Sequence, residues 1–269
     1  MSRYFLPVSG FDAKQFWEQR LQRDYSLKGV GYESLGKGFN YWLYRIRRHL
    51  FRQEVNGLGL QPAAAKVLDI GSGTGFYLTQ LQSLGFCNVT GSDLTETAVG
   101  HLQQNFSGYQ VVQMDISSGE LPLEERFDLI TCFDVLFHIV DDTRFDQAIA
   151  NVARLLKPGG VFLFSDNFAH KEERRTHHVS RSRKDIETSL RKAGLEPGPT
   201  QAMFVLLNEP ARSESGSIHN WWKGVVLFHR YLKPLGWLTG ALLYPLEKSL
   251  LAQRREGPST LMMRCRKAT

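Results

Sequence analysis

Between residues 65 and 166, short apolar runs alternate with amphipathic segments, and this alternation constrains the fold more than any other feature. The apolar runs are nearly continuous, which is typical of parallel strands buried on both faces. Segments with helical spacing separate them, so the pattern predicts successive β–α–β units. We expect strands at 65–70, 88–93, 109–115, 127–135 and 161–166. The sequence therefore predicts an α/β fold with a doubly wound, mostly parallel sheet.

The segments before residue 65 and after residue 166 add helices and two further strands. Apolar residues at 3–4 spacing predict helices at 11–25, 40–55 and 181–194, with a glycine-rich loop at 29–39 between the first two. Strands at 201–207 and 259–267 would bring the sheet to seven. The stretch between these last two strands is too long and too aromatic for a hairpin loop, so we expect a helical insertion there.

The composition excludes several classes of protein. Hydrophobic residues make up 42% of the 269 residues, which is enough for a large core. The formal net charge of +6 permits a nucleic-acid or anionic-membrane partner without requiring one. The three cysteines lack CxxC spacing, which argues against a zinc site and a disulfide framework. The N-terminus does not read as a signal peptide, and no apolar run reaches the roughly 18 residues of a spanning helix. We predict a cytoplasmic protein without a bound metal.

The turn after the first strand indicates the ligand. Residues 65–77 read AKVLDIGSGTGFY, with glycines at 71, 73 and 75. A dinucleotide fingerprint, G-x-G-x-x-G/A, needs a small residue at position 76, where the chain has Phe76. Asp93 ends the next strand, at the distance from the turn where an acidic residue binds ribose hydroxyls. The site is therefore expected to bind a nucleoside that has a ribose but no pyrophosphate.

VLDIGSGTG resembles the first motif of the class I S-adenosylmethionine-dependent methyltransferases, and the later elements up to residue 166 follow in the family's order. The resemblance implies a Rossmann-like fold with S-adenosylmethionine as cofactor and S-adenosylhomocysteine as product. It also implies that the first motif faces the methionine part, that Asp93 holds the ribose, and that Asp115 and Ile116 flank adenine. The backbone near Phe133 would approach the cofactor's ammonium group. The predicted cofactor-binding residues are Asp69, Gly71, Ser72, Gly73, Gly75, Asp93, Leu94, Asp115, Ile116 and Phe133.

The predicted domain organisation follows from this resemblance and from the flanking segments. We expect a helical N-terminal arm or cap at 1–60 and a Rossmann-like cofactor-binding core at 61–207. A helical insertion at 208–258 and the last core strand at 259–269 complete the chain. The arm and the insertion would together cap one face of the sheet.

Methyl transfer to a hydroxyl needs an aligned nucleophile and a group that takes its proton. His138 and Asp134 lie near the end of the fourth strand, and His177 and His178 follow the fifth strand, so these four are the candidate catalytic residues. The alternatives are that His138 only packs or caps a helix, and that the other two histidines belong to a solvated basic loop.

The acceptor side is less defined by the sequence. Tyr32, Asn40, Tyr41 and Trp221 are candidate substrate contacts if the arm and the insertion fold over the site, although the arm would also read as a simple docking helix. We expect a small-molecule acceptor, most simply methylated on oxygen, in natural-product, sugar or lipid-like metabolism. An RNA methyltransferase using the arginine-rich segments, and a non-catalytic cofactor-binding protein, are the alternatives.

Residues 235–252 carry leucines and aromatic residues flanked by lysines and arginines. This composition suits an amphipathic element at a lipid surface. The alternative is that these residues pack the insertion against the sheet.

Overall fold

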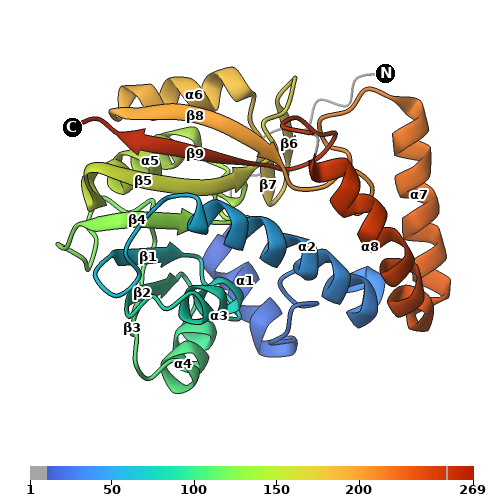
Figure 1. Cartoon of the computed structure of the whole chain (residues 1–269), viewed down its shortest axis with the longest axis horizontal. Helices are drawn as coiled ribbons and strands as arrows, with labels where there is room; N and C mark the ends of the chain where they lie inside the picture. Colours follow the sequence, from blue (N-terminus) through green and yellow to red (C-terminus); the bar gives the residue numbers. More distant parts are fainter. Residues whose placement is uncertain (1–10, 253) are drawn as a thin grey trace.

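A computed structural model describes residues 11–252 and 254–269, so the first ten residues of the predicted arm lie outside it. It contains a seven-stranded sheet with the order β3-β2-β1-β4-β5-β9-β8 (Figure 1). The first five strands in this order are parallel, and β9 runs antiparallel to both of its neighbours. The predicted fold class is confirmed. The strands are β1 (Lys66–Ile70), β2 (Asn88–Asp93), β3 (Gln110–Gln113), β4 (Phe127–Cys132), β5 (Leu156–Asp166), β8 (Leu195–Ala202) and β9 (Leu261–Lys267).

Helices flank the sheet, and several begin at residues whose side chains cap them. Thr95, Asp141 and Ser182 each accept a hydrogen bond from a backbone N–H in the first turn of the following helix. A short hairpin of β6 (Glu173–Arg175) and β7 (His178–Ser180) follows β5. The helices are α1 (Ala13–Arg23), α2 (Gly36–Asn56), α3 (Phe76–Ser83), α4 (Glu96–Asn105), α5 (Asp142–Leu155), α6 (Arg183–Lys192), α7 (Gly216–Tyr231) and α8 (Gly236–Ala252). Three 3₁₀ turns are η1 (Glu33–Leu35), η2 (Leu136–His138) and η3 (Lys233–Leu235).

The predicted strand at 201–207 is displaced, because β8 occupies 195–202 instead. Pro197 makes this segment read as a loop, but β8 lies at the edge of the sheet, where a residue without an N–H is tolerated. The pairing with β9 shifts register between Pro197 and Thr200. Gly198 allows this close approach, since a Cβ there would lie 2.3 Å from the Arg264 carbonyl oxygen.

The apolar residues after β8 form a buried connection that α8 holds in place. Glu247 of α8 is fully buried, and its carboxylate accepts hydrogen bonds from the backbone N–H groups of Val205 (2.7 Å) and Leu206 (2.9 Å). Burial raises the pKa of the Glu247 carboxyl. The carboxylate thus satisfies one buried and one partly buried N–H group that have no strand partner.

The predicted loop at 29–39 is shorter than expected, because α2 begins at Gly36. Glycines let α2 and α8 cross closely: a Cβ on Gly38 would lie 2.7 Å from the Trp237 backbone nitrogen. A Cβ on Gly240 would lie 2.2 Å from the indole ring of Trp42. Gly38 falls within the predicted loop, but the structure places it in α2, where it is needed for helix packing. The carboxyl ends of the parallel strands point toward α1, α2 and α8 (Figure 1).

No helix within residues 11–252 and 254–269 has the length and apolar character needed to cross a membrane.

Candidate functional site

The glycine turn after β1 forms the floor of a cavity of about 890 Å³. Gly71 and Gly73 line the cavity with φ of +71° and +52°, values that residues with a side chain rarely adopt. A Cβ on Gly71 would collide with Val135, 2.2 Å away, whereas one on Gly73 would make ordinary contacts with Val30 of the cavity wall, at 3.5 Å, and the Gly71 carbonyl oxygen, at 3.9 Å. Ser72 also lines the cavity. The turn therefore brings bare backbone to the cavity, as the spacing predicted.

Gly75 has a different role from the one the sequence suggested. It does not line the cavity, and a Cβ there would lie 2.4 Å from the ring of Phe106. Its φ of +79° turns the chain into α3. The third glycine of the motif thus serves helix packing.

Asp69 lies beneath the glycine turn and outside the cavity wall. It is 1% exposed, and its Oδ1 accepts a hydrogen bond from the Thr131 hydroxyl at 2.6 Å. Its backbone oxygen accepts from the hydroxyls of Ser72 and Ser92. Burial raises the pKa of Asp69 to about 6. The structure therefore places Asp69 as a support of the turn, without direct access to a ligand in the cavity.

Asp93 stands at the end of β2 and lines the cavity. Its Oδ2 accepts from the Gly73 N–H at 2.9 Å, and its Oδ1 accepts from the backbone and hydroxyl of Thr95 at 2.9 and 2.8 Å. Burial raises the pKa of its carboxyl, and these hydrogen bonds oppose that effect. A fixed carboxylate at this position is suited to accept hydrogen bonds from a ribose diol.

The next wall of the cavity is apolar with one carboxylate. Leu94, Ile116 and Met114 line it together with Asp115. Asp115 accepts from the backbone N–H of Ser117 at 2.9 Å and forms an ion pair with Arg144. The predicted cofactor residues from β2 and β3 are therefore brought together around one compartment of the cavity.

The N-terminal helix α1 closes this compartment. Trp17 and Leu21 of α1 line the cavity. The carboxylate of Glu18 accepts from the backbone N–H groups of Glu96 (2.7 Å) and Thr97 (3.1 Å), so α1 caps the first turn of α4. The loop that follows α1 also reaches the glycine turn, since the Tyr25 hydroxyl donates to the Gly73 carbonyl at 2.9 Å.

Beyond Phe133, which also lines the cavity, the partly exposed Asp134 lines the far wall and is paired with a buried arginine behind it. Asp134 has an uncommon positive φ of 59°, and its backbone N–H donates to the Ser165 hydroxyl at 2.9 Å. Its Oδ2 pairs with Arg47 of α2, a side chain that is 8% exposed. Burial alone would lower the pKa of Arg47, but the charge of Asp134 and the contributions of Tyr77 and Tyr44 together outweigh it, and the pKa is raised. The strain at Asp134 and the buried partner fix one carboxylate at the cavity wall.

His138 lines the same wall and is held in one tautomer. Its Nδ1 lies 2.7 Å from the His177 carbonyl oxygen, which can only accept, so Nδ1 carries the proton. Burial lowers the pKa of His138 to about 4, which leaves the ring neutral with a lone pair on Nε2. The ring also contacts the edge of Trp17, with centroids 4.9 Å apart.

His177 and His178 do not line the cavity. The ring of His177 stacks on Phe16, and His178 Nε2 lies 2.8 Å from both Asn167 and Ser180. The structure thus places the two residues behind His138, where they position it.

The four predicted substrate contacts lie away from the cavity. Asn40 is buried and bonds to the backbone of Tyr32, and the Tyr32 hydroxyl donates to Asn208 at 2.5 Å. Tyr41 packs on Trp237, and the indole of Trp221 donates to the Leu206 carbonyl. Tyr44 and Tyr77 line the cavity instead. The sequence did not point to these tyrosines, to Trp17 or to Arg47 as site residues, although Tyr44 lies one helical turn after Asn40 and Tyr41 on α2.

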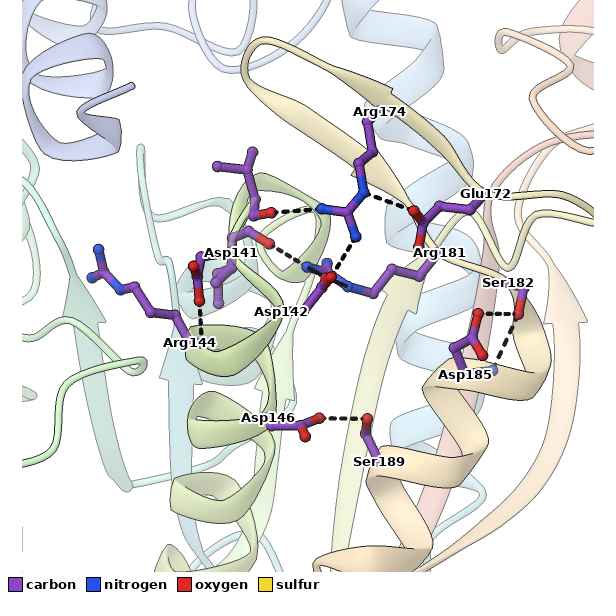
Figure 2. Close-up of polar contacts among 12 residues, drawn as sticks. Asp141, Asp142, Arg144, Asp146, Glu172, Arg174, Arg181, Ser182, Asp185 and Ser189 are labelled. Atoms are coloured by element: carbon purple, nitrogen blue, oxygen red, sulfur yellow. Dashed lines mark hydrogen bonds and ion pairs between the residues drawn. The ribbon is translucent and has the colours of Figure 1, made fainter. Parts of the chain in front are cut away.

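The arginine-rich segment after β5 is largely paired within the protein. Figure 2 shows Arg174 and Arg181 converging on Asp142 in the first turn of α5. Arg174 also pairs with Glu172, and Arg181 lies over the ring of Phe145 at 4.0 Å. These contacts anchor the β6–β7 hairpin. They leave this segment little free positive charge with which to bind phosphates.

The residues of the first compartment fit the nucleoside part of S-adenosylmethionine, with a carboxylate for the ribose, apolar side chains for adenine and bare backbone beside the turn. Comparison with known proteins agrees. A family model described as a methyltransferase domain matches residues 67–160. A ubiquinone biosynthesis O-methyltransferase from Xanthomonas axonopodis pv. citri is 32% identical over 186 residues, which cover 61% of this chain and 75% of that protein.

The chain belongs to the class I S-adenosylmethionine-dependent methyltransferases. Its cofactor is S-adenosylmethionine. An enzyme of the same name from Pseudomonas putida F1 is 39% identical over 107 residues, 38% of this chain, and the match spans only 44% of that relative.

Solved structures share the fold of this methyltransferase at low identity. The N-methyltransferase NodS from Bradyrhizobium japonicum, in complex with S-adenosylhomocysteine, has a TM-score of 0.58 at 20% identity, covering 95% of this chain and 98% of that one. The magnesium protoporphyrin IX methyltransferase from Synechocystis PCC 6803, with bound S-adenosylmethionine, has a TM-score of 0.59 at 15% identity, with 97% and 99% coverage. The [4+2]-cyclase SpnF has a TM-score of 0.55 at 17% identity, with 82% and 81% coverage. The shared fold therefore does not identify the reaction or the acceptor.

Proposed function

We propose that this protein transfers the methyl group of S-adenosylmethionine to a hydroxyl oxygen of a small, largely apolar acceptor. The observation that carries the proposal is that one cavity joins the nucleoside compartment to Asp134 and His138. Its volume of about 890 Å³ lies near the upper end of the range for small-molecule pockets, roughly 300–1,000 Å³, which leaves room for two ligands. The names of the O-methyltransferase relatives support oxygen as the acceptor atom.

The chain's residues divide the work between binding and proton removal. Asp93 and Asp115 hold the nucleoside and so fix the direction from which the methyl group is presented. The cofactor supplies the electrophilic carbon: the sulfur–carbon bond breaks, the oxygen–carbon bond forms, and sulfur keeps the electron pair. His138 Nε2 accepts the hydroxyl proton as the new bond forms. A positioned base typically contributes about 10²–10⁴-fold to such a step.

The ion-paired Asp134 has a separate role in this scheme. Arg47 orients its carboxylate through the ion pair, while 28% of the Asp134 side chain stays exposed at the cavity. It would accept a hydrogen bond from a second hydroxyl of the acceptor or from the cofactor's ammonium group.

The rest of the wall defines the chemistry of the acceptor. Trp17, Tyr44, Tyr77 and Phe133 line the cavity with aromatic rings, and Tyr77 and Phe133 stack with centroids 4.4 Å apart. Burial raises the pKa of Tyr44 to about 12, so its hydroxyl stays protonated at neutral pH. Such a wall favours a flat or apolar molecule with few polar groups.

The test combines product detection with a variant of the proposed base. Cofactor carrying a labelled methyl group is incubated with the protein and a cell extract, which is then separated into small molecules, lipids and RNA. Label in a small-molecule or lipid fraction supports the proposal, while label in RNA or in no fraction contradicts it.

With an acceptor in hand, His138→Gln should lower turnover at least about a hundredfold while leaving the S-adenosylhomocysteine affinity unchanged. A loss of only a few-fold would remove His138 from the role of base. Because its pKa is about 4, native turnover should also lack a His138 titration between neutral pH and pH 5.

A further inference from the structure

Helix α8 exposes a row of leucines on the side that does not pack on the protein. Leu235, just before α8, and Leu238, Leu242 and Leu246 recur every three or four residues and are 40%, 58%, 67% and 49% exposed. The opposite side buries Gly240, Glu247 and Leu251. A helix that is apolar on all sides is normally enclosed by protein or lipid. Within the described chain, no other segment covers the exposed row of α8.

Helix α7 and the turn that joins it to α8 extend this surface. Leu227 is 59% exposed, Tyr231 74%, Leu232 44% and Trp237 50%. Among the described residues, every exposed large hydrophobic side chain lies on α7, η3, α8 or the residue that joins α7 to η3, except Tyr41 of α2, which packs on Trp237. We call Leu227, Tyr231, Leu232, Leu235, Trp237, Leu238, Leu242 and Leu246 the apolar face. Such concentration differs from the scattered exposed apolar residues of ordinary surfaces.

The charges around the apolar face have a single sign. Residues 216–252 contain Lys223, Arg230, Lys233 and Lys248, and none of them forms an ion pair with another described residue. The one acidic residue in the range, Glu247, is buried and accepts backbone hydrogen bonds. The outer surface of this hairpin therefore presents apolar side chains together with uncompensated positive charge.

We propose that the α7–α8 hairpin binds the surface of an anionic lipid bilayer, lying in the interface without crossing it. Leucines would enter the acyl boundary, Trp237 and Tyr231 would lie at headgroup level, and the basic side chains would reach anionic phosphates. Within the described residues no helix could span the bilayer, which fits an interfacial position. The hairpin forms one end of the molecule, away from β1, β2 and β3 (Figure 1). A second copy of the chain is less suited, because it would bring like charges together.

For residues 235–252 the sequence left two interpretations, a lipid-surface element or packing of the insertion against the sheet. The structure shows that α8 packs on α2 and on the segment after β8 with the side opposite the apolar face. Binding to lipid is independent of which acceptor the cavity takes, so failure of one proposal does not entail failure of the other.

The test is flotation of the full chain with vesicles of phosphatidylcholine alone and of phosphatidylcholine mixed with phosphatidylglycerol. We expect binding to the anionic vesicles that weakens as salt rises. Leu238→Gln/Leu242→Gln should lower partitioning at least about tenfold, since burying even one leucine favours binding by about that factor. Lys233→Gln should lower it about fivefold on anionic vesicles.

Lys184→Gln is the matched charge control, because Lys184 is exposed on α6 and forms no ion pair with the described residues. It should bind vesicles as the native protein does. Circular dichroism and S-adenosylhomocysteine binding equal to native show that each variant is folded. If the native protein floats with neither kind of vesicle, the proposal is overturned. It is also overturned if Lys184→Gln loses as much vesicle binding as Lys233→Gln. A native dimer in sedimentation velocity that Leu238→Gln/Leu242→Gln dissociates would instead assign the apolar face to a second copy.

Discussion

Three glycines with similar backbone strain should give three different results when replaced by alanine. Gly59, Gly73 and Gly75 have φ of +69°, +52° and +79°, so each alanine meets the same left-handed backbone, which costs about 1–2 kcal/mol. Alanine also restricts the unfolded chain, which returns about 0.4–1 kcal/mol. The net loss from strain alone is therefore about 1 kcal/mol. Gly59 isolates this cost, because a Cβ there has no atom within 4 Å.

The surroundings of the other two glycines add distinct effects. A Cβ on Gly75 would lie 2.4 Å from the Phe106 ring, and overpacking of this kind costs about 1–3 kcal/mol more. Gly75→Ala should therefore lose about 2–4 kcal/mol in total. Gly73→Ala should lose no more stability than Gly59→Ala, because its nearest neighbour is Val30 at 3.5 Å. Its methyl group would instead occupy the cavity beside the cofactor.

The assay pairs thermal unfolding with calorimetry of S-adenosylhomocysteine binding. At about 2–4 °C per kcal/mol, Gly59→Ala should lower Tm by a few degrees and Gly75→Ala by two to four times as much. Gly73→Ala should match Gly59→Ala in Tm but bind S-adenosylhomocysteine at least about tenfold more weakly, whereas Gly59→Ala binds as native. Equal Tm values for Gly59→Ala and Gly75→Ala would refute the packing argument. Native affinity in Gly73→Ala would refute the placement of the cofactor against the turn.

Three further predictions concern buried ionisable groups. Glu247→Ala leaves the buried Val205 N–H without an acceptor, at about 1–3 kcal/mol, and removes the bond to the partly buried Leu206 N–H. Urea unfolding should therefore show a loss of at least about 1–3 kcal/mol; an unchanged midpoint would contradict the hydrogen bonds. Arg47→Met removes the partner of Asp134 at a largely buried site and should cost about 3 kcal/mol by the same assay, and a neutral outcome would show that the pair contributes nothing to folding. Burial lowers the pKa of both His138 and His178 to about 4, below the ordinary 6.5, so the stability they contribute is complete above pH 6.5 and is lost as pH falls toward 4. The free energy of unfolding in urea should therefore fall less steeply with acid in His138→Gln/His178→Gln than in the native protein. An identical pH profile would refute the pKa shifts.

The sequence predicted the core of the fold well because its signals are local. The buried strands are continuous apolar runs, and the glycine turn and Asp93 lie within one β–α–β unit, so their proximity follows from chain order. The edge strand β8 was predicted at the wrong residues because its two prolines suppress the strand pattern in the sequence. Prolines are tolerated there because β8 has a neighbouring strand on one side only. No local pattern could reveal that β8 lies at the edge.

The acceptor side was predicted poorly because it depends on contacts between distant segments. Arg47 belongs to an arginine-rich helix that reads as solvated, yet it is buried because Asp134, 87 positions later, meets it at the cavity. Asn40 is an attractive ligand by type, but the fold uses both ends of its amide to hold the Tyr32 backbone. Residue type alone could not distinguish these cases.

The glycine-mediated crossing of α2 and α8 has a consequence for how this protein can evolve. Position 240 is glycine because the indole of Trp42 fills the space of its side chain, and position 38 is glycine because the backbone of Trp237 does the same. Substitutions at these sites are therefore coupled across almost 200 residues of sequence. A relative with a larger residue at position 240 needs a smaller one at position 42. The N-terminal arm and the late insertion should accordingly be inherited and remodelled together, even where the sheet between them stays constant.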